Sequence, residues 1–104
     1  MQLAKTVYSE TAKLPDCELF GLTTQMRRAA VSIPSNIAEG YGRVGRGEYL
    51  KHLGYAYGSL NELDTQILLA EMIGYEMQFA DLKQQVSEVG KMLQALVTKL
   101  RAEP

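Results

Sequence analysis

Apolar side chains recur at steps of three and four residues between Gln25 and Arg43. This spacing places them on one side of an α-helix, so we expect this segment to be a helix that faces a hydrophobic core. The row consists of Met26, Ala30, Ile33, Ile37 and Tyr41, with Leu22 and Leu19 continuing it backwards. A second, polar row advances by the same steps and consists of Arg28, Ser32, Asn36, Glu39 and Arg43. One helix is therefore expected to supply both core packing and the polar groups of the one candidate site.

Pro34 interrupts this helical pattern, because a proline inside a helix removes one backbone hydrogen bond and crowds the carbonyl of Ala30. Two interpretations compete. Either the helix stops near Ser32 and restarts with Pro34 in its first turn, or one helix continues through a kink. The apolar row keeps its phase across Pro34, whereas a true break would usually reset it. We therefore predict one kinked helix over residues 17–42, with Asp16 as its N-cap.

Three further segments show helical spacing of their apolar residues. A short first helix is expected over residues 2–14, ended by Pro15. A long helix is expected from Gly47 or Glu48 to Ile73, and a last one over residues 77–101. No linker, repeat or low-complexity segment separates them. The predicted fold is all-α, a single domain over residues 1–104 that forms an antiparallel up-down four-helix bundle with short connections.

The third predicted helix is more apolar than the core of one bundle requires. Its main stripe alternates steps of four and three and consists of Tyr49, Leu53, Ala56, Leu60, Leu63, Ile67 and Ala70. A second stripe and its flanks add Leu50, Tyr57, Leu68, Tyr55, Leu69 and Met72. This additional apolar width indicates a second partner surface. Gly54 and Gly58 lie four residues apart and would let a neighbouring helix approach closely.

The composition excludes several classes of protein. Hydrophobic residues make up 46% of the chain and the formal net charge is −1, as in an ordinary globular domain. No apolar run approaches the roughly 20 residues that a membrane helix needs, and the N-terminus does not resemble a signal peptide, so we expect a cytoplasmic protein. The single cysteine, Cys17, excludes an intrachain disulfide. We expect no cofactor and no small-molecule substrate.

Residues 40–47 contain the spacing G-x-G-x-x-G, which also occurs in dinucleotide-binding proteins. In those proteins a strand leads into the glycines and a helix leads out, so that backbone amides meet the pyrophosphate. Here a helix leads in. We therefore interpret the segment as a loop between two helices, in which glycine tolerates the left-handed conformation.

Basic residues are concentrated in the middle of the chain. They are Arg27, Arg28, Arg43, Arg46 and Lys51, against the acidic residues Glu39 and Glu48 in the same interval. One hypothesis is a nucleic-acid-binding patch, with Arg43 and Arg46 on a glycine loop that follows the phosphate backbone. The other is a solvated end of the bundle with ordinary ion pairs, which the net charge of −1 favours.

A structural polar network is the other candidate site, built from Arg28, Asn36, Glu39 and Glu62. If either carboxylate turns inward it needs a partner, and for Glu39 the partner on the same helix row is Arg28 or Arg43. A dinuclear metal site would need a Glu-x-x-His pattern, which His52 lacks, so we expect no metal. A catalytic pair of Cys17 with His52 has no support in the sequence, and we expect no catalytic residues.

The runs QMRRAAVSIPSNIAEGYGR and AYGSLNEL, within a pattern that spans nearly the whole chain, resemble the proteins encoded in intervening sequences of bacterial 23S rRNA genes. This resemblance implies a four-helix protomer that assembles into a ring-like homopentamer. A similar protein, the accessory protein of diversity-generating retroelements, binds nucleic acid and a reverse transcriptase through a basic surface. Family members commonly carry a longer first helix that contains Trp, and this chain contains none.

These observations favour a non-enzymatic, homo-oligomeric scaffold, with a pentamer implied by the resemblance. The alternative is an RNA-binding or DNA-binding accessory protein, in which symmetry would repeat a weak basic patch and multiply its effect.

Overall fold

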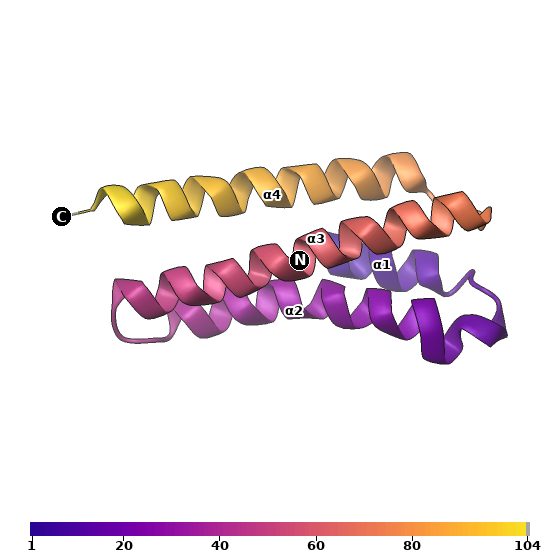
Figure 1. The fold of residues 1–104 in the computed structure, drawn as a ribbon, viewed down its shortest axis with the longest axis horizontal. Coiled ribbons are helices and arrows are strands. Elements are labelled where there is room, and N and C mark those ends of the chain that lie inside the picture. The colour runs from indigo at the N-terminus through magenta and orange to yellow at the C-terminus, as the bar shows by residue number, and fades with distance from the viewer. Residues whose placement is uncertain (104) are drawn as a thin grey trace.

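The computed structural model describes residues 1–103 as four α-helices joined by short connections (Figure 1). The helices are α1 (Gln2–Thr11), α2 (Thr24–Tyr41), α3 (Arg46–Ile73) and α4 (Phe79–Ala102). A 3₁₀ turn, η1 (Asp16–Glu18), and a π-helical turn, η2 (Leu19–Thr23), lead into α2. No strand occurs over residues 1–103. The predicted all-helical, four-helix architecture is confirmed.

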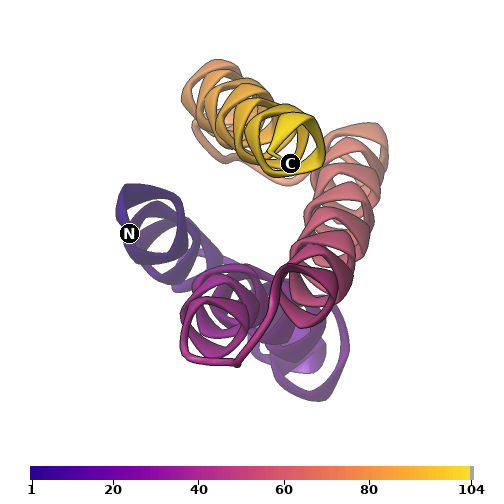
Figure 2. The same ribbon diagram turned by 90° about the vertical axis from the view of Figure 1, so that its left-hand side faces the viewer.

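The four helices follow one another around the bundle in chain order, as Figure 2 shows in a view along the long axis. The molecule measures 49 × 23 × 18 Å. Because α1 has 10 residues and α4 has 24, α1 runs beside less than half of α4 at about 1.5 Å per residue. Figure 1 accordingly places the N-terminus near the middle of the bundle. The end at which α2 turns into α3 is built from three helices only.

All four helices contribute to one hydrophobic core. Its large, fully buried side chains include Leu3, Met26, Ile33, Leu53, Leu63, Ile67, Leu82 and Leu93. The apolar row of α2 enters this core only over its middle part. Leu19 is 50% exposed because it precedes the regular helix, and Tyr41 is 77% exposed because it is the last residue of α2. The expectation that these two side chains face the core was wrong.

The entry into α2 also differs from the sequence-based expectation. The first helix ends at Thr11 rather than at residue 14, and regular helix resumes only at Thr24 rather than at Cys17. The interruption lies at Gly21, whose backbone is non-helical with φ −113° and ψ −113°. The cap at this point is Glu18 and not Asp16, because the Glu18 carboxylate accepts a hydrogen bond from the Leu22 backbone N–H at 3.3 Å.

Pro34 does not end α2, which continues as one helix from Thr24 to Tyr41. The prediction of a single helix through Pro34 is therefore confirmed. The two glycines that do require the left-handed region are Gly45, at the start of α3, and Gly74, at its end, with φ of 100° and 101°. A helix leads into the glycine-rich loop and a helix leads out, so the loop has the helix-to-helix character predicted for it.

Glu10 joins α1 to the start of α4, because its buried carboxylate caps α4. The Gln78 backbone N–H donates to Glu10 Oε1 at 2.7 Å, and Lys13 Nζ donates to Glu10 Oε2 at 2.9 Å. Burial opposes ionisation of this carboxyl, but the two hydrogen bonds together with the positive charge of Lys13 outweigh it and hold the pKa of Glu10 below its usual value. Since α4 has no capping side chain of its own, α1 supplies it.

Candidate functional site

The C-terminal part of α3 leaves four large apolar side chains open to solvent. Their exposed fractions are 44% for Leu68, 46% for Leu69, 84% for Met72 and 52% for Ile73. We call these four residues the α3 apolar surface. The other stripe expected on this helix lies differently, since Leu50 and Tyr57 are partly buried. The apolar excess predicted for this helix is thus present, but it is concentrated near the C-terminal end.

A groove between α2 and α3 borders this surface. It has a volume of about 430 Å³ and is lined by Glu18, Leu22, Gln25, Glu62, Gln66, Leu69 and Ile73. Its lining contains two carboxylates and no basic side chain, so we call it the acidic groove. Gln66 Nε2 donates to Glu62 Oε1 at 3.3 Å. The other amide atom, Gln66 Oε1, is buried and accepts no hydrogen bond from residues 1–103.

Glu18, at one end of the acidic groove, is held ionised by its partners. Tyr75 Oη donates to Glu18 Oε2 at 2.6 Å. This hydrogen bond, followed by the one from the Leu22 backbone N–H, holds the pKa of Glu18 below its usual value. The same bond raises the pKa of Tyr75 to about 12. The negative charge at this end of the groove is therefore fixed over the whole neutral range.

A second groove lies on the other side of α2, between α2 and α1. It has a volume of about 480 Å³ and is lined by Tyr8, Thr24, Arg27, Arg28, Val31 and Ser32. Its lining contains two guanidinium groups and no acidic side chain, so we call it the basic groove. Arg27 is fixed in place, because its Nε donates to Thr11 Oγ1 at 2.8 Å and its guanidinium lies 4.8 Å from the centre of the Tyr8 ring. Arg28 is exposed.

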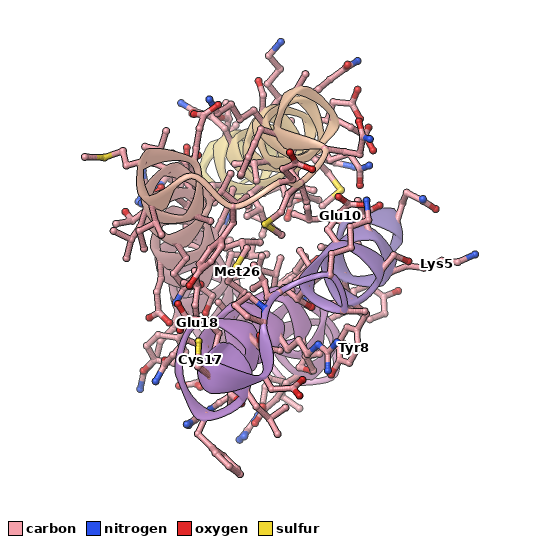
Figure 3. All side chains as sticks on the ribbon, turned by 90° about the vertical axis from the view of Figure 1, so that its right-hand side faces the viewer. Lys5, Tyr8, Glu10, Cys17, Glu18 and Met26 are labelled. Atoms are coloured by element: carbon pink, nitrogen blue, oxygen red, sulfur yellow. The ribbon has the colours of Figure 1, made fainter. Side chains whose placement is uncertain are left out.

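Figure 3 shows this arrangement of side chains along the bundle axis. Tyr8 projects outward from α1, on the outer side of the molecule next to α2. Glu18 lies on the side of α2 that faces α3, beside Cys17. The two grooves thus occupy neighbouring faces of the molecule, with α2 between them.

The polar residues of α2 are joined to α3 by a short series of hydrogen bonds. Asn36 Oδ1 lies 3.3 Å from His52 Nδ1, and Asn36 Nδ2 donates to Ser32 Oγ at 3.0 Å. Ser59 Oγ in turn donates to Ser32 Oγ at 2.8 Å. His52 is buried, and its ring meets the Tyr55 ring edge to face at 5.4 Å between centroids. These contacts fix the register of the two helices.

The four residues expected to form a polar network are placed separately. Glu39 pairs with Arg43 at 2.7 Å on the surface, and this hydrogen bond holds the pKa of Glu39 below its usual value. Glu62 bonds Gln66 in the acidic groove, and Arg28 lies in the basic groove. Only Asn36 belongs to the network between α2 and α3. Its actual partners include His52 and Ser59, which the row pattern of α2 alone could not identify.

The five basic residues do not share one site, because only Arg27 and Arg28 line the basic groove. Arg28 and Arg43 are 15 residues apart on the axis of α2 and its extension, which corresponds to roughly 22 Å. Arg46 binds the end of α4, where its Nη1 donates to the carbonyl oxygens of Leu100, at 3.1 Å, and Glu103. Lys51 is exposed on α3. The capping role of Arg46 has no sequence signal, because it depends on where the last helix ends.

Cys17 and His52 lie at opposite ends of the α2–α3 pair. Cys17 is exposed in η1, beside Glu18, whose partner is Tyr75 after the end of α3. His52 is near the start of α3, beside Asn36. In the described part of the chain no group of three His, Cys, Asp or Glu side chains could hold a metal ion. Across the same residues, none of the helices is long and apolar enough to span a bilayer.

Comparison with known proteins identifies the family. A comparison with curated proteins finds no match. Among solved structures, the chain is similar to a protein of unknown function from the S23 ribosomal protein family of Bacteroides thetaiotaomicron VPI-5482, with a TM-score of 0.74 and 17% sequence identity. The match covers 91% of this chain and 97% of that one, and it supports the fold. Residues 1–95 match the sequence profile of the 23S rRNA-intervening sequence proteins, and the chain belongs to that family.

Proposed function

We propose that this protein is a non-enzymatic scaffold that works as a homo-oligomer. The observation that carries the proposal is the α3 apolar surface, where Leu68, Leu69, Met72 and Ile73 are all 44% exposed or more. Single exposed apolar residues are common, but four within six positions form a contiguous patch of the kind found at protein–protein contacts. A second copy of the same chain is always available to cover it.

The size of the exposed surface supports association. A compact monomer of this mass, 11.6 kDa, exposes roughly 5,800 Å². This chain exposes 6321 Å², and its radius of gyration of 14.7 Å exceeds the roughly 13 Å expected for a compact domain of 104 residues. The excess arises from the elongated shape and the short α1. Packing copies side by side would remove such surface from water.

The mass of the purified protein tests this proposal. A pentamer, the assembly implied by the family resemblance, has a mass of about 58 kDa, which is five times 11.6 kDa. Light scattering coupled to size-exclusion chromatography, supported by sedimentation equilibrium, measures it directly. A folded protein that stays at the monomer mass across micromolar concentrations refutes the proposal.

A substitution in the α3 apolar surface tests whether these residues hold the assembly together. Met72→Lys should weaken assembly, because it places a charge in an apolar contact. Met92→Lys on α4 is the matched control: Met92 is also exposed, at 44% against 84% for Met72, and lies outside the α3 apolar surface. We expect a lower mass for Met72→Lys alone, with unchanged helix content in both variants.

Nucleic-acid binding is the competing function. Arg43 is already paired with Glu39, Arg46 holds the end of α4, and Arg27 is bonded to α1. These contacts weigh against a dedicated phosphate-binding patch. Retention of a structured RNA at low salt, lost steeply as salt rises and weakened by Arg43→Ala combined with Arg46→Ala, would favour that function over the scaffold.

A further inference from the structure

A third groove lies between α3 and α4, and Figure 2 shows α1 and α2 on the other side of these two helices. It has a volume of about 340 Å³ and is lined by Leu50, Leu53, Gly54, Tyr57, Gln94, Val97, Thr98 and Arg101. We propose that this α3–α4 groove binds an acidic amphipathic helix of a partner protein. The inference goes beyond the homo-oligomer, because the groove shares no residue with the α3 apolar surface, the acidic groove or the basic groove.

Glycine leaves room for a helix on the α3 side of the groove. Gly54 and Gly58 are exposed and lie four residues apart, which is about one turn of α3. No neighbouring atom lies within 4 Å of the Cβ position at either residue. The sequence predicts that these glycines let another helix approach closely, and no helix within residues 1–103 makes that approach. The space beside them is therefore open to a helix of another protein.

The open part of the α3–α4 groove is two helical turns long. Leu50 and Tyr57 on α3 are seven residues apart, which corresponds to about 10 Å. Further along the same two helices, Lys83 Nζ binds Glu71 Oε1 at 2.6 Å. Glu71 follows Tyr57 by two heptads and Lys83 precedes Val97 by two heptads, so this ion pair lies on the same side and closes the groove at that end. A short helix fits the part that remains open.

The lining of the groove suits the apolar face of an amphipathic helix. Leu50, Tyr57 and Val97 are partly buried along the groove, whereas Gln94 and Thr98 are exposed at its edge. An apolar floor between polar edges is the arrangement in which a helix lays its apolar side chains into a groove. A small molecule would stay largely exposed beside such open side chains, whereas ligand pockets bury most of the ligand surface.

The charged residues beside the α3–α4 groove are basic. Arg101 lines it, Lys51 stands three residues before Gly54, and Lys91 stands three residues before Gln94. Residues three apart are neighbours on a helix surface, so both lysines lie next to the groove. None of the three cations forms an ion pair with residues 1–103, and the groove lining contains no acidic residue. This charge favours a partner that carries carboxylates and repels a basic one.

A synthetic helical peptide tests the proposal. The probe is a fluorescent peptide of about 15 residues, with leucines three and four residues apart on one face and glutamate and alanine elsewhere. The control peptide carries lysine in place of every glutamate. Fluorescence anisotropy during titration with the purified protein measures both dissociation constants. We expect the acidic peptide to bind at least about tenfold more tightly than the basic one.

Two variants locate the binding in the groove. Gly54→Leu fills the groove without crowding the fold, because the Cβ position at Gly54 is open, and it should raise the dissociation constant at least about tenfold. Arg101→Glu should also weaken binding, because it places a carboxylate opposite those of the peptide. Gly47→Leu, at another open position, and Lys5→Glu, exposed on α1, are the matched controls and should bind as the wild type does. Circular dichroism verifies that all four variants remain helical.

Normal peptide binding by Gly54→Leu would overturn the proposal, and so would equal binding of the acidic and basic peptides or no binding of the acidic one. Retention of a structured RNA without binding of the acidic peptide would assign the basic residues to phosphate instead. Light scattering separates this inference from the scaffold proposal. A lower mass for Gly54→Leu than for the wild type would show that a second copy occupies the groove, which overturns the partner helix and leaves the homo-oligomer in place. A monomeric wild type that binds the peptide would overturn the homo-oligomer alone.

Discussion

Gly40 sets the distance between α2 and α3, and replacing it tests how closely these helices must approach. A Cβ atom at position 40 would lie 2.7 Å from the Cβ of His52 and 3.1 Å from the Tyr49 ring. It would also lie 3.3 Å from the Tyr49 carbonyl oxygen. The Cβ of His52 is fixed by its backbone, so it cannot turn away as the end of a flexible side chain could. Gly40→Ala therefore requires the helices to separate locally.

The change in folding stability caused by Gly40→Ala follows from two opposing effects. Overpacking of this kind costs about 1–3 kcal/mol, and the rigid neighbour places Gly40→Ala in the upper part of that range. Alanine regains at most about 1 kcal/mol over glycine within a helix, and less near a helix end such as this one. We therefore expect a net loss of about 1–2 kcal/mol of stability, which corresponds to a fall in Tm of about 5–15 °C for a domain of this size.

Gly58→Ala is the control, because nothing lies within 4 Å of the Cβ position at Gly58 in the middle of α3. This variant should gain about 0.5–1 kcal/mol through helix propensity alone. Both free energies of unfolding are measured by urea denaturation at one fixed protein concentration, since assembly makes stability depend on concentration. Equal stability of the two alanine variants would refute the close approach at Gly40.

Three other results are expected. Glu10→Ala should lower the free energy of unfolding in urea by about 1 kcal/mol, because α4 loses the carboxylate that caps it, and an unchanged value would mean that the cap is replaced by water. The contribution of Glu18 to folding stability is complete above the ordinary pKa of glutamate and is lost as the pH falls through the lowered pKa of the folded state. The contribution of Tyr75 to folding stability is complete below pH 10 and is lost as the pH rises from 10 toward about 12. Tyr75→Phe should remove the alkaline dependence from the pH profile of stability and reduce the acidic one, because the Leu22 backbone N–H still bonds Glu18. A profile identical to that of the wild type would contradict the bond between Tyr75 and Glu18. Arg46→Ala should speed amide hydrogen exchange in the last turn of α4 and leave the middle of the helix unchanged; uniform acceleration along α4 would argue against a capping role.

The helices were predictable from the sequence because their apolar residues are regularly spaced, and the side chains in these rows are the ones that form the core. The third helix was expected to end at Ile73 and does so, since Gly74 supplies the left-handed residue that follows. The continuity of α2 through Pro34 was also predictable from the phase of its apolar row. The break at Gly21 was not, because a lone glycine within an apolar pattern carries no signal for a change of backbone direction.

The residues of the two grooves were only partly predictable. A helical pattern tells which side chains share a face, but the lining of a groove comes from two helices whose register depends on contacts between them. Arg28 and Glu62 were both singled out as polar residues of interest, although as members of one network. The structure places them in separate grooves on either side of α2. Glu10 and Arg46 act as caps for α4, a helix distant in sequence, and no local pattern indicates such a role.

The break at Gly21 and the exposure of the α3 apolar surface have one physical origin. Ser59 bonds Ser32 at 2.8 Å, so in this antiparallel pair each residue backwards along α2 stands opposite one residue forwards along α3. Regular helix in α2 begins at Thr24, eight residues before Ser32, and that point lies opposite about residue 67 of α3. Beyond it α3 continues to Ile73 with only the irregular turns η1 and η2 on its α2 side, so the apolar side chains that face that side have no regular turn of α2 to pack against. Restoring the helix through this point should therefore cover part of the α3 apolar surface.

Gly21→Ala, whose Cβ would meet Glu18 Oε1 at 2.9 Å, would displace the Glu18 carboxylate and favour regular helix over residues 19–23. We expect this variant to be more helical by circular dichroism and to assemble less tightly in sedimentation. A variant that gains helix and assembles as before would show that the α3 apolar surface does not depend on the break.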